Sequence, residues 1–259
     1  MTGTDNDRAA LSAVVTRTRY LLLDFDGPVC SIFAGLPAPT VADQLRKLFT
    51  AQQLSDRVKN TSDPIEVFTC AAEVNPELAT RVEAEMTDLE VAAAATAKPT
   101  PYVHEVLAGC RESGRTVAVV SNNSALAVNG YLDRHGLSKG VGLVVARTSH
   151  DPSLLKPSPH LLEIAVQKTA AHPAATALVG DSLTDIEAAH RAGITSIGYA
   201  NKPGKREAMT QINAGAVIGS MADLALSLRA QPLSGLLLRG QFKLKGQFSN
   251  REAVLHVVC

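Results

Sequence analysis

The stretch YLLLDFDGPVC, residues 20–30, decides the fold class of this 259-residue chain. Three leucines lead directly into Asp24 and Asp26, which are separated only by Phe25. A continuous apolar run of this kind is typical of a strand that is buried on both faces of a parallel sheet. Paired carboxylates are costly in a protein core. Their place at the end of the run therefore indicates a functional site at the edge of a sheet.

Five further apolar runs of the same kind follow along the chain. They are TVAVVSNN (116–123), VGLVVAR (141–147), TALVGDS (176–182), ITSIGYA (194–200) and GAVIGS (215–220). Helical patterns accompany these runs at 101–114, 124–137, 159–170, 183–193 and 221–230. This alternation predicts an α/β fold, with a Rossmann-like doubly wound parallel sheet covered by helices on both faces.

The segment 38–98 interrupts the alternation, because it contains helical patterns and no strand pattern. We predict that it forms an inserted all-helical cap, while 18–37 and 99–228 form the Rossmann-like core. Residues 1–17 are predicted to be a loose leader, and 229–259 a C-terminal extension of unknown role.

Glycine and proline punctuate both ends of the predicted cap, at 35–39 and 98–101. We expect hinges there, and a lid that closes over the site and excludes water. The acidic run RVEAEMTDLE (81–90) within the cap is interpreted as a solvated helix face.

Composition narrows the classes of partner. Lys+Arg and Asp+Glu number 25 each, aromatic residues make up 4%, and tryptophan is absent. These values disfavour binding to nucleic acid or to an anionic membrane surface. The scattered cysteines are typical of reduced thiols, the N-terminus lacks a signal-peptide pattern, and no apolar run reaches the roughly 20 residues of a membrane span. We expect a soluble cytoplasmic protein that binds a small molecule; the oligomeric state is not indicated.

Polar residues follow the predicted strands at one edge of the sheet, where ligands bind in open α/β folds. They are Asp24, Asp26, Ser121, Asn122, Lys156, Asp181 and Asp185. The carboxylates of Asp24 and Asp181, with the carbonyl oxygen of Asp26, are ligands that suit Mg²⁺. A carboxylate can also act as a nucleophile and form an aspartyl-phosphate.

The remaining residues of this set fit phosphoryl transfer. Lys156 would neutralise charge shared by nucleophile and phosphate, and Ser121 with the Asn122 amide would hold phosphoryl oxygens. The second carboxylate, Asp26, can protonate the leaving oxygen and later deprotonate a water molecule.

In their order, these motifs resemble those of the haloacid dehalogenase (HAD) superfamily, in its phosphatase-like subgroup with a helical cap after the first strand (phosphoglycolate phosphatase-like). DFDG (24–27) resembles the nucleophile motif, Ser121 in VVSNNS the second, Lys156 in LKPSP the third, and GDSLTDIEAA with Asp181 and Asp185 the fourth. The similarity covers roughly residues 18–228.

The resemblance implies Mg²⁺, with Asp24 as nucleophile, Asp26 as acid and base, and Asp181 as a metal ligand. It further implies that Asp185 binds the metal through water or orients Lys156. Pro28 departs from the family pattern, in which threonine or valine is more common, so the loop that gates the site is expected to differ.

The expected activity is Mg²⁺-dependent hydrolysis of a small phosphorylated metabolite through an aspartyl-phosphate. A sugar-phosphate phosphomutase would use the same two aspartates, and a non-catalytic binding protein on this scaffold would normally have lost a motif residue. Asp26 disfavours a dehalogenase. A phosphonate hydrolase would need a reactive cap lysine, and Lys47, Lys59 and Lys98 have no telling context. The sequence does not identify the substrate.

Overall fold

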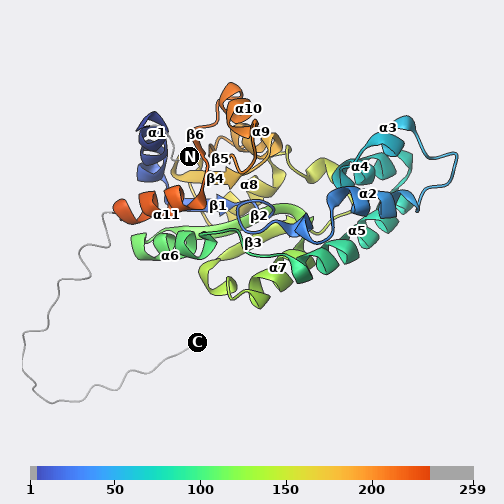
Figure 1. The fold of residues 1–259 in the computed structure, drawn as a ribbon, viewed down its shortest axis with the longest axis horizontal. Coiled ribbons are helices and arrows are strands. Elements are labelled where there is room, and N and C mark those ends of the chain that lie inside the picture. Colours follow the sequence, from blue (N-terminus) through green and yellow to red (C-terminus); the bar gives the residue numbers. More distant parts are fainter. Residues whose placement is uncertain (1–4, 234–259) are drawn as a thin grey trace, which may run out of the picture.

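The computed structural model of the chain describes residues 5–233. Its centre is a six-stranded parallel sheet with the order β3-β2-β1-β4-β5-β6 (Figure 1). The strands are β1 (Tyr20–Leu23), β2 (Thr116–Ser124), β3 (Leu143–Arg147), β4 (Thr176–Gly180), β5 (Thr195–Tyr199) and β6 (Ala216–Ile218). Each strand coincides with one of the apolar runs of the sequence, although β2 extends one residue beyond its run, and the predicted α/β class is confirmed. The strand order reverses at β1, which is where such sheets bind ligands.

The sheet is buried on both faces, as the continuous apolar runs predicted. In β1, Leu21 and Leu23 pack into the apolar cluster on one face, and Leu22 packs into the cluster on the other. In β2, Val119 and Val120 divide between the two faces in the same way. Alternating side chains of a strand point to opposite faces, so an all-apolar strand requires a covering layer on each side.

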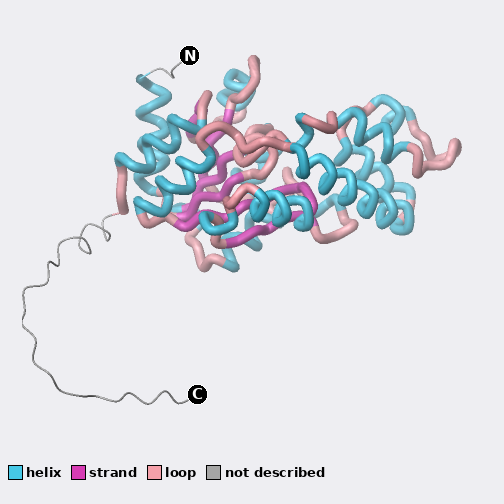
Figure 2. Tube along the Cα trace, turned by 60° about the horizontal axis from the view of Figure 1, so that its bottom comes forward, coloured by secondary structure: helices cyan, strands magenta, loops and turns pink. Residues whose placement is uncertain are grey.

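Helices supply both covering layers (Figure 2). One face packs against α1 (Asp5–Arg17), α6 (Val103–Ser113), α7 (Ala125–Arg134) and α11 (Met221–Ala230). The other packs against α8 (His160–Lys168) and α9 (Leu183–Arg191). Helix α10 (Lys205–Gln211) lies beside α9 and β6. Short 3-10 helices occur at Ile32–Ala34, Ser138–Gly140, Pro152–Leu154 and Pro173–Ala175.

Helix α1 corrects one prediction. Residues 1–17 were expected to be a loose leader, which is wrong for Asp5–Arg17. Leu11, Val14 and Val15 are buried in the core, and their i, i+3, i+4 spacing is the signature of an amphipathic helix. The Arg115 guanidinium also donates hydrogen bonds to the carbonyl oxygens of Val15 and Thr18, each at 2.9 Å. The short apolar stripe was therefore enough to dock the segment.

The chain between β1 and β2 carries α2 (Ala38–Arg46), α3 (Asp56–Asn60), α4 (Pro64–Val74) and α5 (Pro76–Thr96). We call these four helices the helical insert; it extends to one side of the sheet in Figures 1 and 2. Asp63 and Asn75 accept backbone N–H hydrogen bonds at the starts of α4 and α5, and a proline occupies the next position in each. These are standard helix-start signals. The division into a cap and a core stays a prediction.

No helix within residues 5–233 is long and apolar enough to cross a membrane. Helix α11 ends at Ala230, slightly beyond the predicted end of the core. Residues 234–259 of the predicted C-terminal extension lie outside the described residues.

Candidate active site

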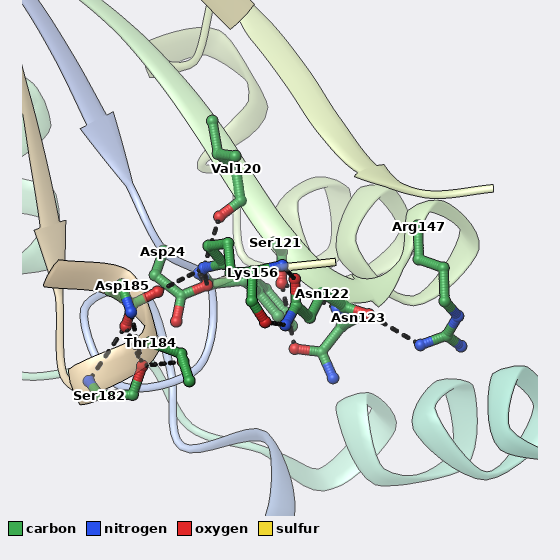
Figure 3. A network of polar contacts seen from close by, with 11 residues as sticks. Asp24, Val120, Ser121, Asn122, Asn123, Arg147, Lys156, Ser182, Thr184 and Asp185 are labelled. Atoms are coloured by element: carbon green, nitrogen blue, oxygen red, sulfur yellow. Dashed lines mark hydrogen bonds and ion pairs between the residues drawn. The ribbon is translucent and has the colours of Figure 1, made fainter. Parts of the chain in front are cut away.

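The predicted site residues come together at the carboxyl ends of β1, β2 and β4. Figure 3 shows Asp24, Ser121, Asn122, Lys156 and Asp185 among them. They border a cavity of about 350 Å³ between the sheet edge and the helical insert. The predicted residues that line it are Asp24, Asp26, Asn122, Lys156, Asp181 and Asp185. Ser121 is fully buried beside the cavity wall, where its hydroxyl accepts a hydrogen bond from the Asn123 backbone at 3.1 Å.

Lys156 is the charged centre of the site. Its buried ammonium lies 2.7 Å from Asp24 Oδ1 and 2.6 Å from Asp185 Oδ1, and it donates to the Val120 carbonyl at 3.2 Å. Burial by itself would lower the pKa of Lys156, but the carboxylates of Asp185 and Asp24 outweigh it, so the pKa is raised. Lys156 is therefore a permanent positive charge next to Asp24.

Asp24 follows directly on β1 and is buried. Its Oδ1 accepts the Phe25 N–H at 2.8 Å as well as the Lys156 ammonium. Burial and then the Asp185 carboxylate raise the pKa of Asp24 well above its usual range, although Lys156 opposes the shift. Both contacts use Oδ1, and neither involves Oδ2.

Asp26 lies in the turn after β1, and its Oδ1 accepts the Ile32 N–H at 3.0 Å. Burial, followed by repulsion from Asp181, raises the pKa of Asp26 to about 6. A carboxyl group with this pKa exchanges a proton readily near neutral pH, which is the property required of a general acid and base.

The two aspartates that follow β4 have different surroundings. Asp181 Oδ2 contacts Lys205 Nζ at 2.6 Å and accepts from the Asn201 amide at 3.0 Å. Asp185 uses Oδ1 for Lys156, and its Oδ2 accepts the Ser182 hydroxyl at 2.6 Å and backbone N–H at 3.0 Å. Both oxygens of Asp185 are thus engaged, and it orients Lys156 in this structure.

Sequence reasoning did not assign Asn201 and Lys205. A signal was present, because both belong to the polar stretch NKPGK (201–205) that follows a predicted strand at the same edge. Both Asn201 and Lys205 donate hydrogen bonds to Oδ2 of the Asp181 carboxylate.

Two glycines allow the acidic residues to approach each other. A Cβ atom on Gly27 would lie 2.4 Å from Asp181 Cγ, and Gly27 has a φ of +97°. A Cβ atom on Gly180 would lie 2.3 Å from Asp185 Cβ. Only glycine leaves room for these carboxylates and accepts the left-handed backbone at position 27.

The oxygens of Asp24, Asp181 and Asp185 form a candidate metal site, since one carboxylate oxygen of each lies within 4.8 Å of the others. Carboxylate oxygens are the donors that hard cations such as Mg²⁺ prefer. Two ammonium groups contact these three carboxylates, Lys156 at Asp24 and Asp185 and Lys205 at Asp181, so one negative charge is left to be balanced. The donor set therefore fits a divalent cation.

Asn122, in the irregular last part of β2, is hydrogen-bonded to the backbone of Lys156. Its Oδ1 accepts the Lys156 N–H at 2.8 Å, and its Nδ2 donates to the Lys156 carbonyl at 3.0 Å. This reciprocal pair fixes the backbone of Lys156 relative to Ser121 and Asn122. The side-chain amide of Asn122 is engaged in this pair, and the phosphate contact of Asn122 stays a prediction.

Comparison with known proteins assigns the chain to a family. Residues 42–199 match the family described as haloacid dehalogenase-like hydrolase. A phosphoglycolate phosphatase from Vibrio vulnificus is 27% identical over 192 residues, covering 70% of this chain and 82% of that protein. The pyrophosphatase PpaX from Oceanobacillus iheyensis is 30% identical over 100 residues, covering 39% of this chain and 46% of that protein.

Solved structures share the fold. CbbY from Rhodobacter sphaeroides in complex with phosphate superposes with a TM-score of 0.58 at 17% identity, covering 80% of this chain and 96% of that chain. A HAD-superfamily hydrolase from Ehrlichia chaffeensis gives 0.53 at 16% identity, covering 83% and 97%. With the matched family residues and the site described above, the chain belongs to the haloacid dehalogenase-like hydrolases.

Proposed function

We propose that this protein is a Mg²⁺-dependent phosphatase that hydrolyses a small phosphate monoester through an aspartyl-phosphate on Asp24. The observation that carries the proposal is the Lys156 ammonium, held 2.7 Å from Asp24 and 2.6 Å from Asp185 at the wall of the cavity. This charge would balance Asp24 together with an incoming phosphate. The relatives named as phosphatases support the same activity.

Asp24, Asp181 and the carbonyl oxygen of Asp26 would hold the cation, with Asp185 either joining through water or acting only on Lys156. When bound, Mg²⁺ would polarise the phosphoryl group and offset its charge. Ser121 and the backbone of Asn122 would hold phosphoryl oxygens, as oxyanion donors do in other phosphoryl-transfer sites.

The reaction would proceed in two displacements at phosphorus. In the first, Asp24 Oδ2 forms a bond to phosphorus while the bond to the leaving oxygen breaks, and Asp26 gives that oxygen its proton. In the second, Asp26 takes a proton from water as the water oxygen attacks phosphorus and the bond to Asp24 breaks. Inorganic phosphate leaves, and both aspartates regain their starting states.

The experiment that tests this function is turnover of para-nitrophenyl phosphate, with inorganic phosphate measured in the presence and absence of Mg²⁺. We expect stoichiometric release of phosphate and nitrophenol only with the cation. A phosphomutase would return the phosphoryl group to a substrate and release little phosphate. A binding protein on this scaffold would show no turnover at all.

Replacing Asp26 by asparagine should slow the enzyme by roughly 10²- to 10⁴-fold, the usual contribution of a general acid or base. The asparagine cannot donate the proton, but position 26 keeps its backbone carbonyl. Para-nitrophenol needs little protonation as it leaves, so single-turnover phosphorylation should fall less with para-nitrophenyl phosphate than with glycerol phosphate. An equal decrease in the phosphorylation rate with both substrates would show that Asp26 is not the general acid.

The part of the cavity wall that is formed by the helical insert and by Phe33, which precedes it, indicates which leaving group fits. They are formed by Phe33, Ala38, Ser62, Asp63, Pro64, Ile65 and Glu90. These residues offer apolar surface, the hydroxyl of Ser62 and the carboxyl group of Asp63, while the carboxylate of Glu90 is paired with Arg147. Among the described residues that line the cavity, Lys156 is the only basic one, and it is already paired with Asp24 and Asp185. A leaving group with its own carboxylate would meet like charge on this side.

We therefore expect hydroxyethyl phosphate and phosphoethanolamine to be hydrolysed with a higher kcat/KM than phosphoglycolate. The three esters share a two-carbon skeleton and differ only in their terminal group, so the comparison isolates charge. Replacing Asp63 by asparagine should narrow the difference. A clear preference of the wild-type enzyme for phosphoglycolate would contradict this expectation and would favour the substrate named for the Vibrio relatives.

A further inference from the structure

Strand β2 loses its regular pairing with β3 where the phosphate-binding residues are expected. Ser121 pairs with Ala146, and the next paired residue is Ser124, which pairs with Arg147. Asn122 and Asn123 form a bulge between these two pairs. Bulges redirect side chains and are frequent beside active sites, but their backbone needs support from outside the sheet.

Arg147, the last residue of β3, supports the bulge from one side. Its guanidinium is buried, and its Nη1 donates to the Asn122 carbonyl at 2.8 Å, as Figure 3 shows. The same Nη1 donates to Glu90 Oε1 at 3.0 Å, and Nη2 donates to Glu90 Oε2 at 3.0 Å. This is a bidentate pair, the geometry in which arginine and carboxylate bind most strongly.

Glu90 supports the bulge from the other side. It belongs to α5 and is only 1% exposed. Besides the two bonds from Arg147, its Oε1 accepts from the Asn123 side-chain amide at 3.1 Å and its Oε2 accepts from the Ser124 backbone N–H at 2.7 Å. Each carboxylate oxygen thus accepts two hydrogen bonds, which fills its capacity.

The remaining donors of Arg147 are also satisfied. Nε donates to Glu83 Oε1 at 3.1 Å and Nη2 to the Thr87 hydroxyl at 3.2 Å, both on α5. Every N–H group of the guanidinium therefore has an acceptor. A buried polar network in which all members are satisfied fixes one geometry. The run RVEAEMTDLE was interpreted as a solvated face, which is wrong for Glu90; Glu83, Thr87 and Glu90 share one face of α5 that meets Arg147.

We propose that Glu90 and Arg147 are positioning residues that hold the Asn122–Asn123 bulge in the shape that binds the phosphoryl group. Helix α5 of the insert is then a fixed part of the phosphate site. Neither residue carries out chemistry; both act through the backbone of Asn122 and Ser124 and the side chain of Asn123. The inference rests on the proposed phosphatase function.

The test compares Glu90→Gln with Glu83→Gln as a matched control. Both remove one carboxylate that contacts Arg147, but only Glu90 also contacts the bulge. Binding of inorganic phosphate is measured by calorimetry in the presence of Mg²⁺. The values of kcat and KM are measured with para-nitrophenyl phosphate. We expect Glu90→Gln to weaken phosphate binding and lower kcat/KM by roughly 10- to 10²-fold, the scale of a small misplacement in a site. Glu83→Gln should stay within about twofold of wild type, a change below the scale of one lost hydrogen bond.

A second variant separates positioning from stability. In the double variant Glu90→Leu/Arg147→Met, apolar residues of similar size replace the pair, a change that buried ion pairs often tolerate without loss of folding. We expect a folded protein, judged by its urea midpoint, that still binds phosphate poorly. Wild-type phosphate affinity in either Glu90 variant would overturn the proposal, whatever its stability. Failure of the wild-type protein itself to bind phosphate would instead overturn the proposed function.

Discussion

Replacing Asp24 by asparagine should remove turnover completely. The amide has the size of the carboxylate but is a very poor nucleophile towards phosphorus, so the first bond to phosphorus does not form. Loss of a covalent nucleophile costs on the order of 10⁶-fold in kcat in well-studied hydrolases. The asparagine would also remove one negative charge beside Lys156. The fold should stay intact, because Lys156 keeps its contact with Asp185. The measurement is release of phosphate from para-nitrophenyl phosphate.

The covalent intermediate gives a direct check on the role of Asp24. In the Asp26→Asn variant, the second displacement is slowed, so the phosphoryl group should accumulate on the protein after mixing with substrate. Mass spectrometry of the acid-quenched protein should place it on the peptide that contains Asp24. The double variant with Asp24→Asn should carry none. Turnover near the wild-type rate in Asp24→Asn would end the assignment and would favour direct attack by a metal-activated water.

The sheet could be predicted from the sequence because all of its strands are buried on both faces. Each such strand appears as a continuous apolar run, and glycines mark the helix ends between them. Gly114, Gly136 and Gly193 indeed have positive φ values directly after or close after α6, α7 and α9. Helix α1 was missed because its apolar stripe is only Leu11, Val14 and Val15 within a polar segment.

The convergence of the candidate site residues could be predicted because parallel topology brings strand ends together. Asp24, Ser121 and Asp181 each follow an apolar run, so their convergence needed no knowledge of side-chain packing. Glu90 and Arg147 could not be found in this way. They are 57 positions apart, and nothing local distinguishes a buried glutamate on α5 from a solvated one. Their importance depends on a bulge in β2 that the sequence does not show.

The same pair bears on the lid that the sequence predicted. Hinges at 35–39 and 98–101 stay a prediction, but a rigid rotation of the whole insert would separate Glu90 from Arg147, Asn123 and Ser124 and break their hydrogen bonds. Each lost hydrogen bond to a charged group costs roughly 1.5–3 kcal/mol. Motion of α2 to α4 relative to an anchored α5 avoids this cost. Hydrogen exchange on phosphate binding should therefore change more in α2 to α4 than near Glu90.

Removal of divalent cations should also abolish turnover, and Asp181→Asn should have nearly the same effect. Three carboxylates, those of Asp24, Asp181 and Asp185, come within 4.8 Å of one another, and a dianionic phosphate would add to their repulsion. Lys156 and Lys205 together balance only part of this charge. Without a cation, the carboxylates repel the phosphoryl group from Asp24. Both substrate binding and the attack on phosphorus should therefore fail.

The measurement combines activity with binding. Excess chelator should bring phosphate release to background, and added Mg²⁺ should restore it. Calorimetric titration with Mg²⁺ should show one site in the wild-type protein and severely weakened binding in Asp181→Asn. As a matched control, Asp56→Asn removes a carboxylate of the insert that is 92% exposed and should titrate like wild type. Full activity in excess chelator would rule out the metal. Wild-type Mg²⁺ affinity in Asp181→Asn would instead show that Asp181 is not a ligand of the metal. The contacts of Asp181 with Lys205 and Asn201 would then be its only role in the site.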